Sequence, residues 1–257
     1  MMSKAELEAE IERLAPFHHK LELPHGLSTF LPGKMRREIE KTRVSNLIKH
    51  AFPPLLDACG GSLEGKRVLD VACNCGGFSF AAAEQGAEHV LGFDVVDHYL
   101  EQAALIQRAN AAERVEFRKL DIEKLDPNDI GHFDVTFCFG ILYHLENPVL
   151  AMKKLADVSS DIMLVDTTVM KDNLLERLRK RPLWAMNFPA AANRDSEDSS
   201  TSLWRAEQRV QFKPNVEGVV QLLKFLGFSS VERIKPTVSG LEKRFYQGRR
   251  VAFLARR

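Results

Sequence analysis

Four short segments of the chain have the pattern of buried β-strands, and apolar residues at helical spacing occur between them. The strand segments are Val68–Val71, Val90–Phe93, Val115–Lys119 and Phe133–Phe139. A polar residue or a tight turn follows each segment shortly, as at the carboxyl end of a strand in a parallel sheet. The pattern predicts an α/β fold with a doubly wound, mostly parallel sheet.

Both ends of the chain add further elements. Apolar residues at helical spacing begin near Leu7 and again near Val44. Towards the other end, Asn215 is expected to cap a helix, and the strand segments Val231–Ile234 and Val251–Ala255 follow it. These last two strands would complete a sheet of seven.

The turn after the first strand carries the most informative local chemistry. Asp70 ends the strand, and the small residues Ala72, Asn74 and Gly76 occupy alternate positions after it. Gly76 and Gly77 let the backbone approach a ligand, whose carboxylate is expected to meet free N–H groups of the next helix. A dinucleotide fingerprint would need glycine in place of Ala72 and Asn74, so the turn indicates another nucleotide-type cofactor or an ordinary tight turn.

A second carboxylate falls where such a cofactor would need it. Asp94 lies 24 residues after Asp70 and ends the next strand, with Val95 beside it. A carboxylate at this position can accept hydrogen bonds from both hydroxyls of a ribose. Asp97 is expected to cap the helix that follows.

The fourth strand ends at Phe139 and runs into a loop with the sequence Gly-Ile-Leu-Tyr-His-Leu-Glu-Asn-Pro, which contains Tyr143 and His144. Taken together, these segments resemble the class I S-adenosylmethionine-dependent methyltransferases. The resemblance rests on the acidic residue before a small-x-small-x-Gly turn, and on the Leu-Tyr-His string followed by Asn-Pro. It implies a Rossmann-like sheet and S-adenosyl-L-methionine as the cofactor.

The same resemblance implies roles for individual residues. Asp121 and Ile122 would form the adenine site, with a carboxylate for the exocyclic amine and an apolar side chain against the ring. The alternative for Asp121 is that it is only a turn residue. The full cofactor-binding set is Asp70, Ala72, Asn74, Gly76, Asp94, Val95, Asp121, Ile122 and Phe139.

One branch of the superfamily is similar in its loop motifs, namely the tRNA wobble-uridine 5-oxyacetate carboxymethyltransferases. In that branch a Tyr of the loop and an Arg near the C-terminus hold the carboxylate of a carboxylated cofactor. The matching positions are Tyr143 and Arg250. This chain departs from the branch because it is too short for the long N-terminal portion, so ordinary S-adenosyl-L-methionine is expected instead of the carboxylated form.

The expected organisation has four parts. Residues 1–62 form an N-terminal helical cap, 63–166 the cofactor-binding core, 167–213 an inserted lid, and 214–257 the helix and strand pair that complete the core sheet. The lid is expected because the sequence becomes basic, then aromatic and apolar, then acidic and Ser-rich.

Charge and composition bear on the partners. The 257 residues include 36 Lys and Arg against 35 Asp and Glu, a net charge of +1 without the excess of nucleic-acid binders. We therefore expect a small-molecule acceptor, with tRNA as the alternative if three basic clusters share a face, which are Lys34–Arg37, Arg177–Arg181 and Lys243–Arg250.

Other sequence features are bland. No apolar run approaches the roughly 20 residues of a membrane span, so we expect a cytoplasmic protein, either monomer or homodimer. The four cysteines lack a Cys-x-x-Cys arrangement, so reduced thiols are expected and no metal site. Cys73 and Cys75 lie in the cofactor turn, where their expected role is to fill space.

Catalysis by direct methyl displacement needs alignment and, for a neutral hydroxyl or amine, a general base. His144 is the candidate base and Tyr143 the positioning residue, although a structural histidine is an equal alternative. Lys34, Arg43 and Arg250 are candidates for contact with an anionic group of the acceptor. Trp184 would contact the acceptor or, like Trp204, anchor the lid.

Three functions follow as hypotheses. The first is a methyltransferase acting on a small molecule, at oxygen in preference to nitrogen or sulfur. The second is a tRNA wobble-uridine (carboxy)methyltransferase. The third is a non-catalytic, cofactor-binding subunit, which the intact acidic residues and Gly76 argue against.

Overall fold

The computed structural model describes residues 2–30, 40–171, 180–187 and 211–257. The candidate acceptor contact Lys34 and the candidate anchor Trp204 lie outside the described residues, as do the basic cluster 34–37 and most of the expected lid. The helices and strands given next all belong to these described residues.

The centre of the fold is a seven-stranded sheet in the order β10-β11-β7-β6-β3-β4-β5. Six of the seven strands run in the same direction, and only β11, which lies between β7 and β10, runs antiparallel to its neighbours. The strands are β3 (Arg67–Val71), β4 (His89–Asp94), β5 (Val115–Lys119), β6 (Phe133–Phe139), β7 (Ser159–Thr168), β10 (Ser230–Ile234) and β11 (Arg250–Arg256). The predicted fold class, its terminal antiparallel pair included, is confirmed.

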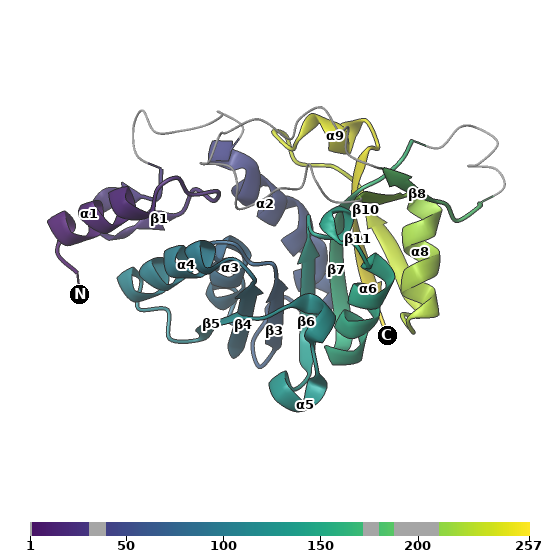
Figure 1. The fold of residues 1–257 in the computed structure, drawn as a ribbon, viewed down its shortest axis with the longest axis horizontal. Helices are drawn as coiled ribbons and strands as arrows, with labels where there is room; N and C mark the ends of the chain where they lie inside the picture. Colours follow the sequence, from purple (N-terminus) through teal and green to yellow (C-terminus); the bar gives the residue numbers. More distant parts are fainter. Residues whose placement is uncertain (1, 31–39, 172–179, 188–210) are drawn as a thin grey trace.

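Helices cover both faces of this sheet (Figure 1). The helices on one face are α1 (Lys4–Leu14), α2 (Glu40–Ala58), α3 (Gly77–Glu84) and α4 (Asp97–Ala109), which share one buried apolar cluster. On the other face, α6 (Pro148–Val158) and α8 (Val216–Phe225) pack with the short α5 (Pro127–Ile130) in a second cluster. The core therefore forms two layers, one on each side of the strands.

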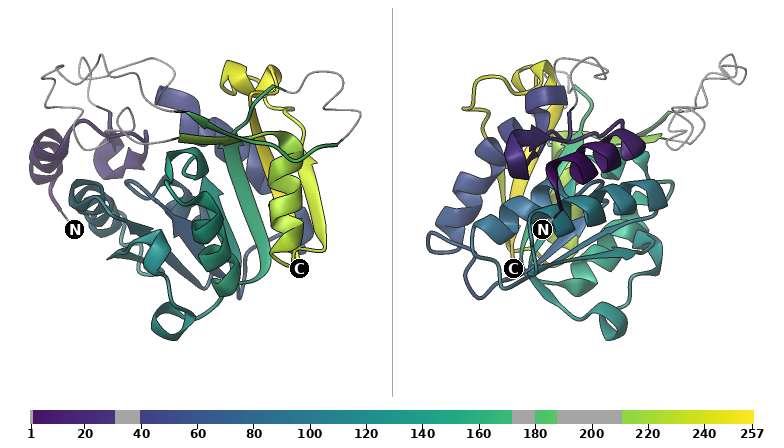
Figure 2. Two further views of the ribbon diagram at one scale, coloured as in Figure 1. Left: turned by 45° about the vertical axis from the view of Figure 1, so that its right-hand side comes forward. Right: turned by 90° about the vertical axis from the view of Figure 1, so that its left-hand side faces the viewer.

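The N-terminal segment is fastened to the core through α4. Helix α1 lies beside α4 (Figure 2), and the buried Gln102 of α4 donates hydrogen bonds to the backbone carbonyls of Leu14 and Pro16. A two-stranded sheet of β1 (Glu22–Leu23) and β2 (Leu27–Ser28) follows, with a 3-10 turn, η1, at Pro24–Gly26. Helix α2 instead packs directly on α3, β10 and β11.

The described residues of the expected lid form a second small sheet. Strand β8 (Trp184–Asn187) pairs with β9 (Gln211–Pro214), and β9 contacts the 3-10 turn η3 (Leu142–His144) after β6. Strand β7 continues to Thr168, so the core sheet runs slightly beyond the expected boundary at residue 166. The four-part division itself stays a prediction.

One expectation about a helix end is wrong. Val96, not Asp97, is the N-cap of α4, because Asp94 Oδ1 accepts a hydrogen bond from Val96 N–H at 3.1 Å and holds the preceding turn. Asp97 opens the helix and forms an ion pair with Lys119. None of the described helices is long and apolar enough to cross a membrane.

Candidate cofactor and acceptor site

The site is set by the order of the strands. Chain order reverses between β3 and β6, with β4 and β5 lying to one side and β7 to the other. Ligands of open α/β sheets bind beyond the carboxyl ends of the strands at such a reversal. The turn after β3 and the loop after β6, which the sequence singled out, meet at this place.

The backbone conformation of the turn after β3 accounts for the small residues in it. The backbone φ angles of Ala72, Asn74 and Gly76 are 54°, 52° and 83°, so all three lie in the left-handed region. Bulky or branched side chains are strongly disfavoured there, whereas Gly and Asn are tolerated. A Cβ on Gly76 would also approach Phe117 Cζ to 2.6 Å, so position 76 requires glycine on two counts.

Asp70 lies below this turn rather than at its surface. Its side chain is buried and accepts a 2.6 Å hydrogen bond from the Ser79 hydroxyl of α3. Burial raises the pKa of Asp70 to about 7, although Ser79 opposes the shift. Asp70 thus fastens α3 to β3, and its cofactor contact stays a prediction.

Asp94 holds the turn to the neighbouring strand. Its carboxylate accepts from Asn74 N–H at 3.0 Å and from Val96 N–H at 3.1 Å, while the residue is 2% exposed. Burial raises the pKa of Asp94, and the backbone N–H groups around it act against that shift. Each carboxylate oxygen keeps a lone pair, so the geometry leaves acceptors for two ribose hydroxyls.

The expectation of free N–H groups at the start of α3 is partly wrong. Gly77 N–H donates to Nδ1 of His19 at 3.1 Å. The role of His19 could not be predicted from the sequence, because 58 residues separate it from Gly77 and no local pattern links them. Burial, with the charges of His18 and Arg43 adding to it, lowers the pKa of His19 to about 3, so the ring is neutral.

A hollow of about 380 Å³ lies beside β4 and β5, where the adenine was expected. Val95, which is 53% exposed, and Asp121 both line it. Asp121 also caps the 3-10 turn η2 (Ile122–Lys124) by accepting from Glu123 N–H, so the turn role and a ligand role are compatible. Ile122 is buried in the core cluster behind this wall.

Phe139 at the end of β6 joins the two halves of the site. Its ring lies 4.6 Å from that of Phe78 on α3 and is stacked on Phe137 at 5.3 Å. Tyr143 and His144 follow on η3 with their ring centroids 4.2 Å apart. Burial, followed by the charges of Arg250 and Arg43, lowers the pKa of His144 to about 4.

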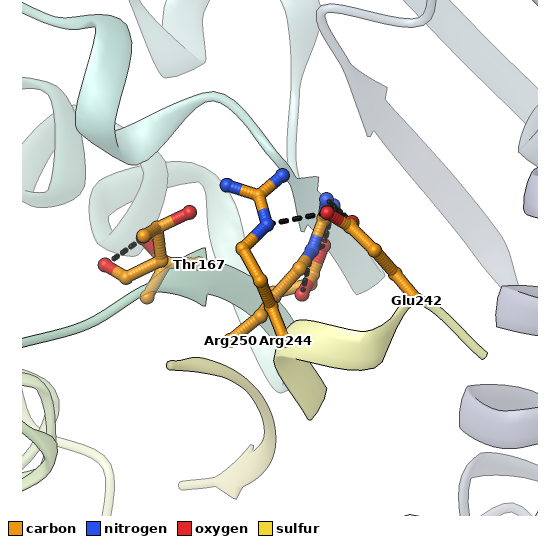
Figure 3. A network of polar contacts seen from close by, with 6 residues as sticks. Thr167, Glu242, Arg244 and Arg250 are labelled. Atoms are coloured by element: carbon orange, nitrogen blue, oxygen red, sulfur yellow. Dashed lines mark hydrogen bonds and ion pairs between the residues drawn. The ribbon is translucent and has the colours of Figure 1, made fainter. Parts of the chain in front are cut away.

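Arg250 lies in a buried ion cluster at the start of β11. Its Nε is 3.0 Å from each oxygen of Asp166 on β7, and Nη1 donates to Glu242 at 2.9 Å. Arg244 also reaches Glu242, and Figure 3 shows both guanidinium groups directed at that carboxylate. Burial opposes the charge of Arg250, but Asp166 raises its pKa, so the cation is permanent.

Arg250 and Tyr143 nevertheless converge. A Cβ built on Gly140 would lie 3.3 Å from Nη2 of Arg250 and 3.7 Å from the hydroxyl of Tyr143. The sequence resemblance paired these two residues, and the structure brings them to the same glycine. Two carboxylates already engage the guanidinium of Arg250. The cluster therefore has little capacity to bind the carboxylate of a ligand.

The remaining candidates differ in position. Arg43 is exposed on α2, and its charge lowers the pKa of both His19 and His144, so it lies near both halves of the site. Trp184 packs against the apolar cluster on the α8 side, which favours the anchoring role. Its contact with an acceptor stays a prediction.

The cysteines of the turn are inert by environment. Cys73 and Cys75 are buried and unpaired. Burial raises the pKa of the Cys75 thiol to about 12, against the opposing backbone N–H groups of His19 and His18. Those N–H groups show that the main chain at residues 18 and 19 lies against the turn, and a thiol of such high pKa is weakly reactive.

Comparison with known families settles the class. Residues 62–211 match the family described as "Methyltransferase domain", which is more than half of the chain. The chain belongs to this family. The fold and the cofactor class inferred from the sequence, a class I methyltransferase that uses S-adenosylmethionine, are thereby confirmed.

Curated relatives of this methyltransferase resemble it over part of its length. The ubiquinone biosynthesis O-methyltransferase of Bordetella avium is 36% identical over 103 residues, which are 38% of this chain and 42% of the relative. The tRNA U34 carboxymethyltransferase of Syntrophotalea carbinolica is 36% identical over 96 residues, or 37% and 29% of the two chains. The matches thus span half or less of these relatives.

Solved structures support the fold. The N-terminal domain of EvdMO1, crystallised in the presence of SAH and D-fucose, has a TM-score of 0.69 at 19% identity, with 100% of this chain and 97% of that chain covered. Magnesium protoporphyrin IX methyltransferase from Synechocystis PCC 6803 has a TM-score of 0.58 at 19% identity, with 87% and 89% covered.

The residues of the site fit the nucleoside of S-adenosylmethionine. Asp94 offers carboxylate oxygens at the reversal of strand order, and the neighbouring hollow combines apolar Val95 with the carboxylate of Asp121. These groups suit ribose hydroxyls, an aromatic base and its exocyclic amine, respectively.

Proposed function

We propose that this methyltransferase transfers the methyl group of S-adenosylmethionine to a hydroxyl of a small-molecule acceptor. The observation that carries the proposal is a neutral His144 on the loop after β6, next to the turn that takes the cofactor. A histidine with a pKa lowered to about 4 is unprotonated at neutral pH, so its ring can accept a proton, although it is less basic than an ordinary imidazole.

The chemistry requires little else from the protein. Bound S-adenosylmethionine supplies an electrophilic methyl group on a positively charged sulfur. His144 would take the proton of the acceptor hydroxyl at an imidazole nitrogen, while the oxygen keeps the electron pair that forms the new bond. Tyr143, in ring contact with His144, would orient the acceptor.

Oxygen is preferred as the nucleophile because a neutral hydroxyl gains most from such a base. A thiolate needs no base at the moment of transfer, and an amine can lose its proton after the step. Arg43 is exposed on α2 and adds a positive charge near His144, which suits an acceptor that carries an anionic group.

The experiment uses methyl-labelled S-adenosylmethionine and a whole-cell extract. Label is separated into extractable small molecules and RNase-sensitive polymer, with Asp94→Ala as the variant that should label neither. Label in small molecules supports the proposal, and an ether or ester linkage of the transferred methyl group, identified by NMR of the product, then assigns oxygen. Label released by RNase would contradict the choice of acceptor.

A tRNA acceptor is the second candidate. Similarity to a tRNA U34 carboxymethyltransferase and the convergence of Tyr143 and Arg250 on Gly140 favour it. The carboxylated cofactor of that reaction would, however, need Arg250, whose donors engage Asp166 and Glu242. A small-molecule acceptor with ordinary S-adenosylmethionine does not require a ligand carboxylate to compete with Asp166 and Glu242 for Arg250.

A non-catalytic cofactor-binding subunit would bind S-adenosylhomocysteine but label no acceptor in either fraction. That outcome, repeated with extracts from several growth conditions, would favour the third hypothesis. The expected cytoplasmic location and the monomeric or homodimeric state stay predictions.

A further inference from the structure

His19 stands out among the residues around the cofactor turn because it comes from the N-terminal segment. Thr29 donates a 2.6 Å hydrogen bond to the His19 carbonyl and accepts one from Leu21 N–H. The neighbouring His18 contacts the Tyr99 hydroxyl of α4 through Nε2 at 3.3 Å. The main chain at His19 is thereby fixed from both sides.

The hydrogen bond from Gly77 determines the tautomer of His19. Because Nδ1 accepts from Gly77 N–H at 3.1 Å, the single ring proton of the neutral imidazole lies on Nε2. A Cβ on Gly77 would meet His19 Nδ1 at 2.6 Å, so only glycine allows the ring to lie this close. His19 therefore presents a fixed N–H donor next to the cofactor turn.

No acceptor for this donor is present in the described part of the chain. None of the described residues is hydrogen-bonded to Nε2, and the residue as a whole keeps some exposed surface. Its ring lies 5.9 Å from that of Phe78, whose own ring contacts Phe139 at the end of β6. The imidazole ring thus lies on the side of the turn that borders the reversal of strand order.

The surroundings favour an anion in front of this donor. Phe78 N–H, in the first turn of α3, has no acceptor among the described residues. The partial positive charge of a helix N-terminus acts at the same place, and the charge of Arg43 is felt at His19 as well. The part of S-adenosylmethionine that suits these groups is the carboxylate of its methionine moiety.

We infer that His19 is a cofactor-binding residue, which donates from Nε2 to the amino-acid carboxylate of S-adenosylmethionine. Gly77 N–H orients the imidazole of His19 by donating to Nδ1. The ligand therefore meets the Nε2–H donor of His19 in place of Gly77 N–H. This inference rests on the proposed function, because it assumes that the turn takes this cofactor. It makes docking of the N-terminal segment part of cofactor binding.

The test compares two ligands that differ in the carboxylate-bearing part. S-adenosylhomocysteine has the amino-acid moiety, whereas 5′-methylthioadenosine has the same nucleoside without it. Affinities of both are measured by calorimetry for the wild-type protein, His19→Asn and His19→Gln. The Asn amide can keep the acceptor for Gly77 N–H but cannot reach the Nε2 position, whereas the Gln amide can place a donor there.

The expected result is a selective loss. His19→Asn should bind S-adenosylhomocysteine about tenfold more weakly, as for one lost hydrogen bond to a charged group, with 5′-methylthioadenosine within about twofold of the wild type. His19→Gln should retain more of the preference for S-adenosylhomocysteine. His25→Asn, at an exposed histidine of the same segment, is the matched control and should change neither affinity.

An equal loss of affinity for both ligands in His19→Asn would overturn the inference and leave His19 a structural role. Unchanged affinity for both ligands would overturn it as well.

A second measurement needs no variant. In the wild-type protein, the imidazole ¹H–¹⁵N spectrum should show the Nε2–H tautomer of His19, with the Nε2 signal shifted by S-adenosylhomocysteine but not by 5′-methylthioadenosine. Failure of the wild type to bind either ligand would instead contradict the proposed function.

Discussion

Two regions at the carboxyl edge of the same sheet bury carboxylates in opposite ways. Beside the cofactor turn, Asp70 and Asp94 are held by a hydroxyl and by backbone N–H groups, and the pKa of each is raised by burial. Across the sheet, Asp166 is buried against the guanidinium of Arg250, which also binds Glu242. We call these the turn region and the Arg250 cluster.

The difference follows from what each region has to do. Neutral donors leave a carboxylate able to accept further hydrogen bonds from neutral groups such as ribose hydroxyls. A guanidinium with two carboxylates compensates its own charge and has little capacity for another anion. The turn region therefore keeps the hydrogen-bonding capacity that the proposed cofactor site needs. The Arg250 cluster instead holds β7, β11 and the segment before α9 (Lys243–Tyr246) together.

His144, between the two regions, gives the largest expected effect. His144→Gln should lower kcat by about 10²–10⁴, the contribution of a general base, and leave S-adenosylhomocysteine affinity unchanged. The lowered pKa, about 4, predicts a wild-type rate that stays flat from pH 8 to 5, because the base is neutral throughout. A rate that falls around pH 6.5 would assign the proton to another group.

Removal of the Arg250 guanidinium should lower the stability of the fold more than it lowers the affinity for the cofactor. Arg250→Met leaves Asp166 and Glu242 without their buried partner and should lower the free energy of unfolding by about 3–5 kcal/mol. Urea denaturation measures this loss. Arg244→Met, at the exposed partner of Glu242, is the control and should cost less than about 1 kcal/mol. Equal losses of unfolding free energy in Arg250→Met and Arg244→Met would contradict the structural role assigned to the buried Arg250 cluster.

Asp94→Ala, in the turn region, should instead lower the affinity for the cofactor more than the stability of the fold. Loss of hydrogen bonds to both ribose hydroxyls predicts a decrease of about 2–3 kcal/mol in binding free energy for S-adenosylhomocysteine and 5′-methylthioadenosine alike. Calorimetry checks both ligands. Asp97→Ala removes only a surface pair with Lys119 and should leave both affinities unchanged. Unaltered affinity in Asp94→Ala would remove this residue from the site.

The raised pKa of Asp70 predicts a pH effect on stability. Folding raises it from 3.8 to about 7, so the folded state binds this proton more tightly than the unfolded chain. Stability therefore falls as the pH rises from about 4 to 7, by up to about 1.4 kcal/mol per pH unit from this residue. Asp70→Asn cannot ionise and should flatten that slope in denaturation curves at several pH values. An unchanged slope would place the titration elsewhere, for example at Asp94.

The smallest effect is expected at His50 on α2. The residue is 2% exposed, its ring contacts Phe245 at 5.4 Å, and neither ring nitrogen has a hydrogen-bond partner among the described residues. Two buried polar atoms without partners favour an apolar replacement. His50→Leu should be neutral or stabilising by about 1 kcal/mol in urea denaturation, and a loss above about 2 kcal/mol would contradict this.

Much of the turn region was predictable because its geometry is local. Steric limits on the left-handed backbone select the small residues at Ala72, Asn74 and Gly76, and these limits act within a few bonds. The strand ends at Asp94 and Phe139 could be read for the same reason, since apolar runs and their polar ends are sequence patterns. The start of α4 was missed by one residue, because a side chain from Asp94 holds the turn before it.

The contacts that set the chemistry could not be read in this way. His19 and Gly77 are 58 residues apart, and Arg250 and Asp166 are 84 apart. Nothing in the local sequence of Arg250 reveals that the carboxylates of Asp166 and Glu242 engage its donors. The lowered pKa of His144 likewise depends on burial and on cations from α2 and β11.

By itself, the sequence determined the class I architecture and the methyltransferase family, since each depends on short-range patterns of apolar, small and acidic residues. Tertiary structure alone decided that His19 meets Gly77, that His144 is neutral and that Arg250 is compensated. The physical reason is that burial and long-range pairing fix the charge and the free donors of a side chain, and both arise only when distant segments pack together.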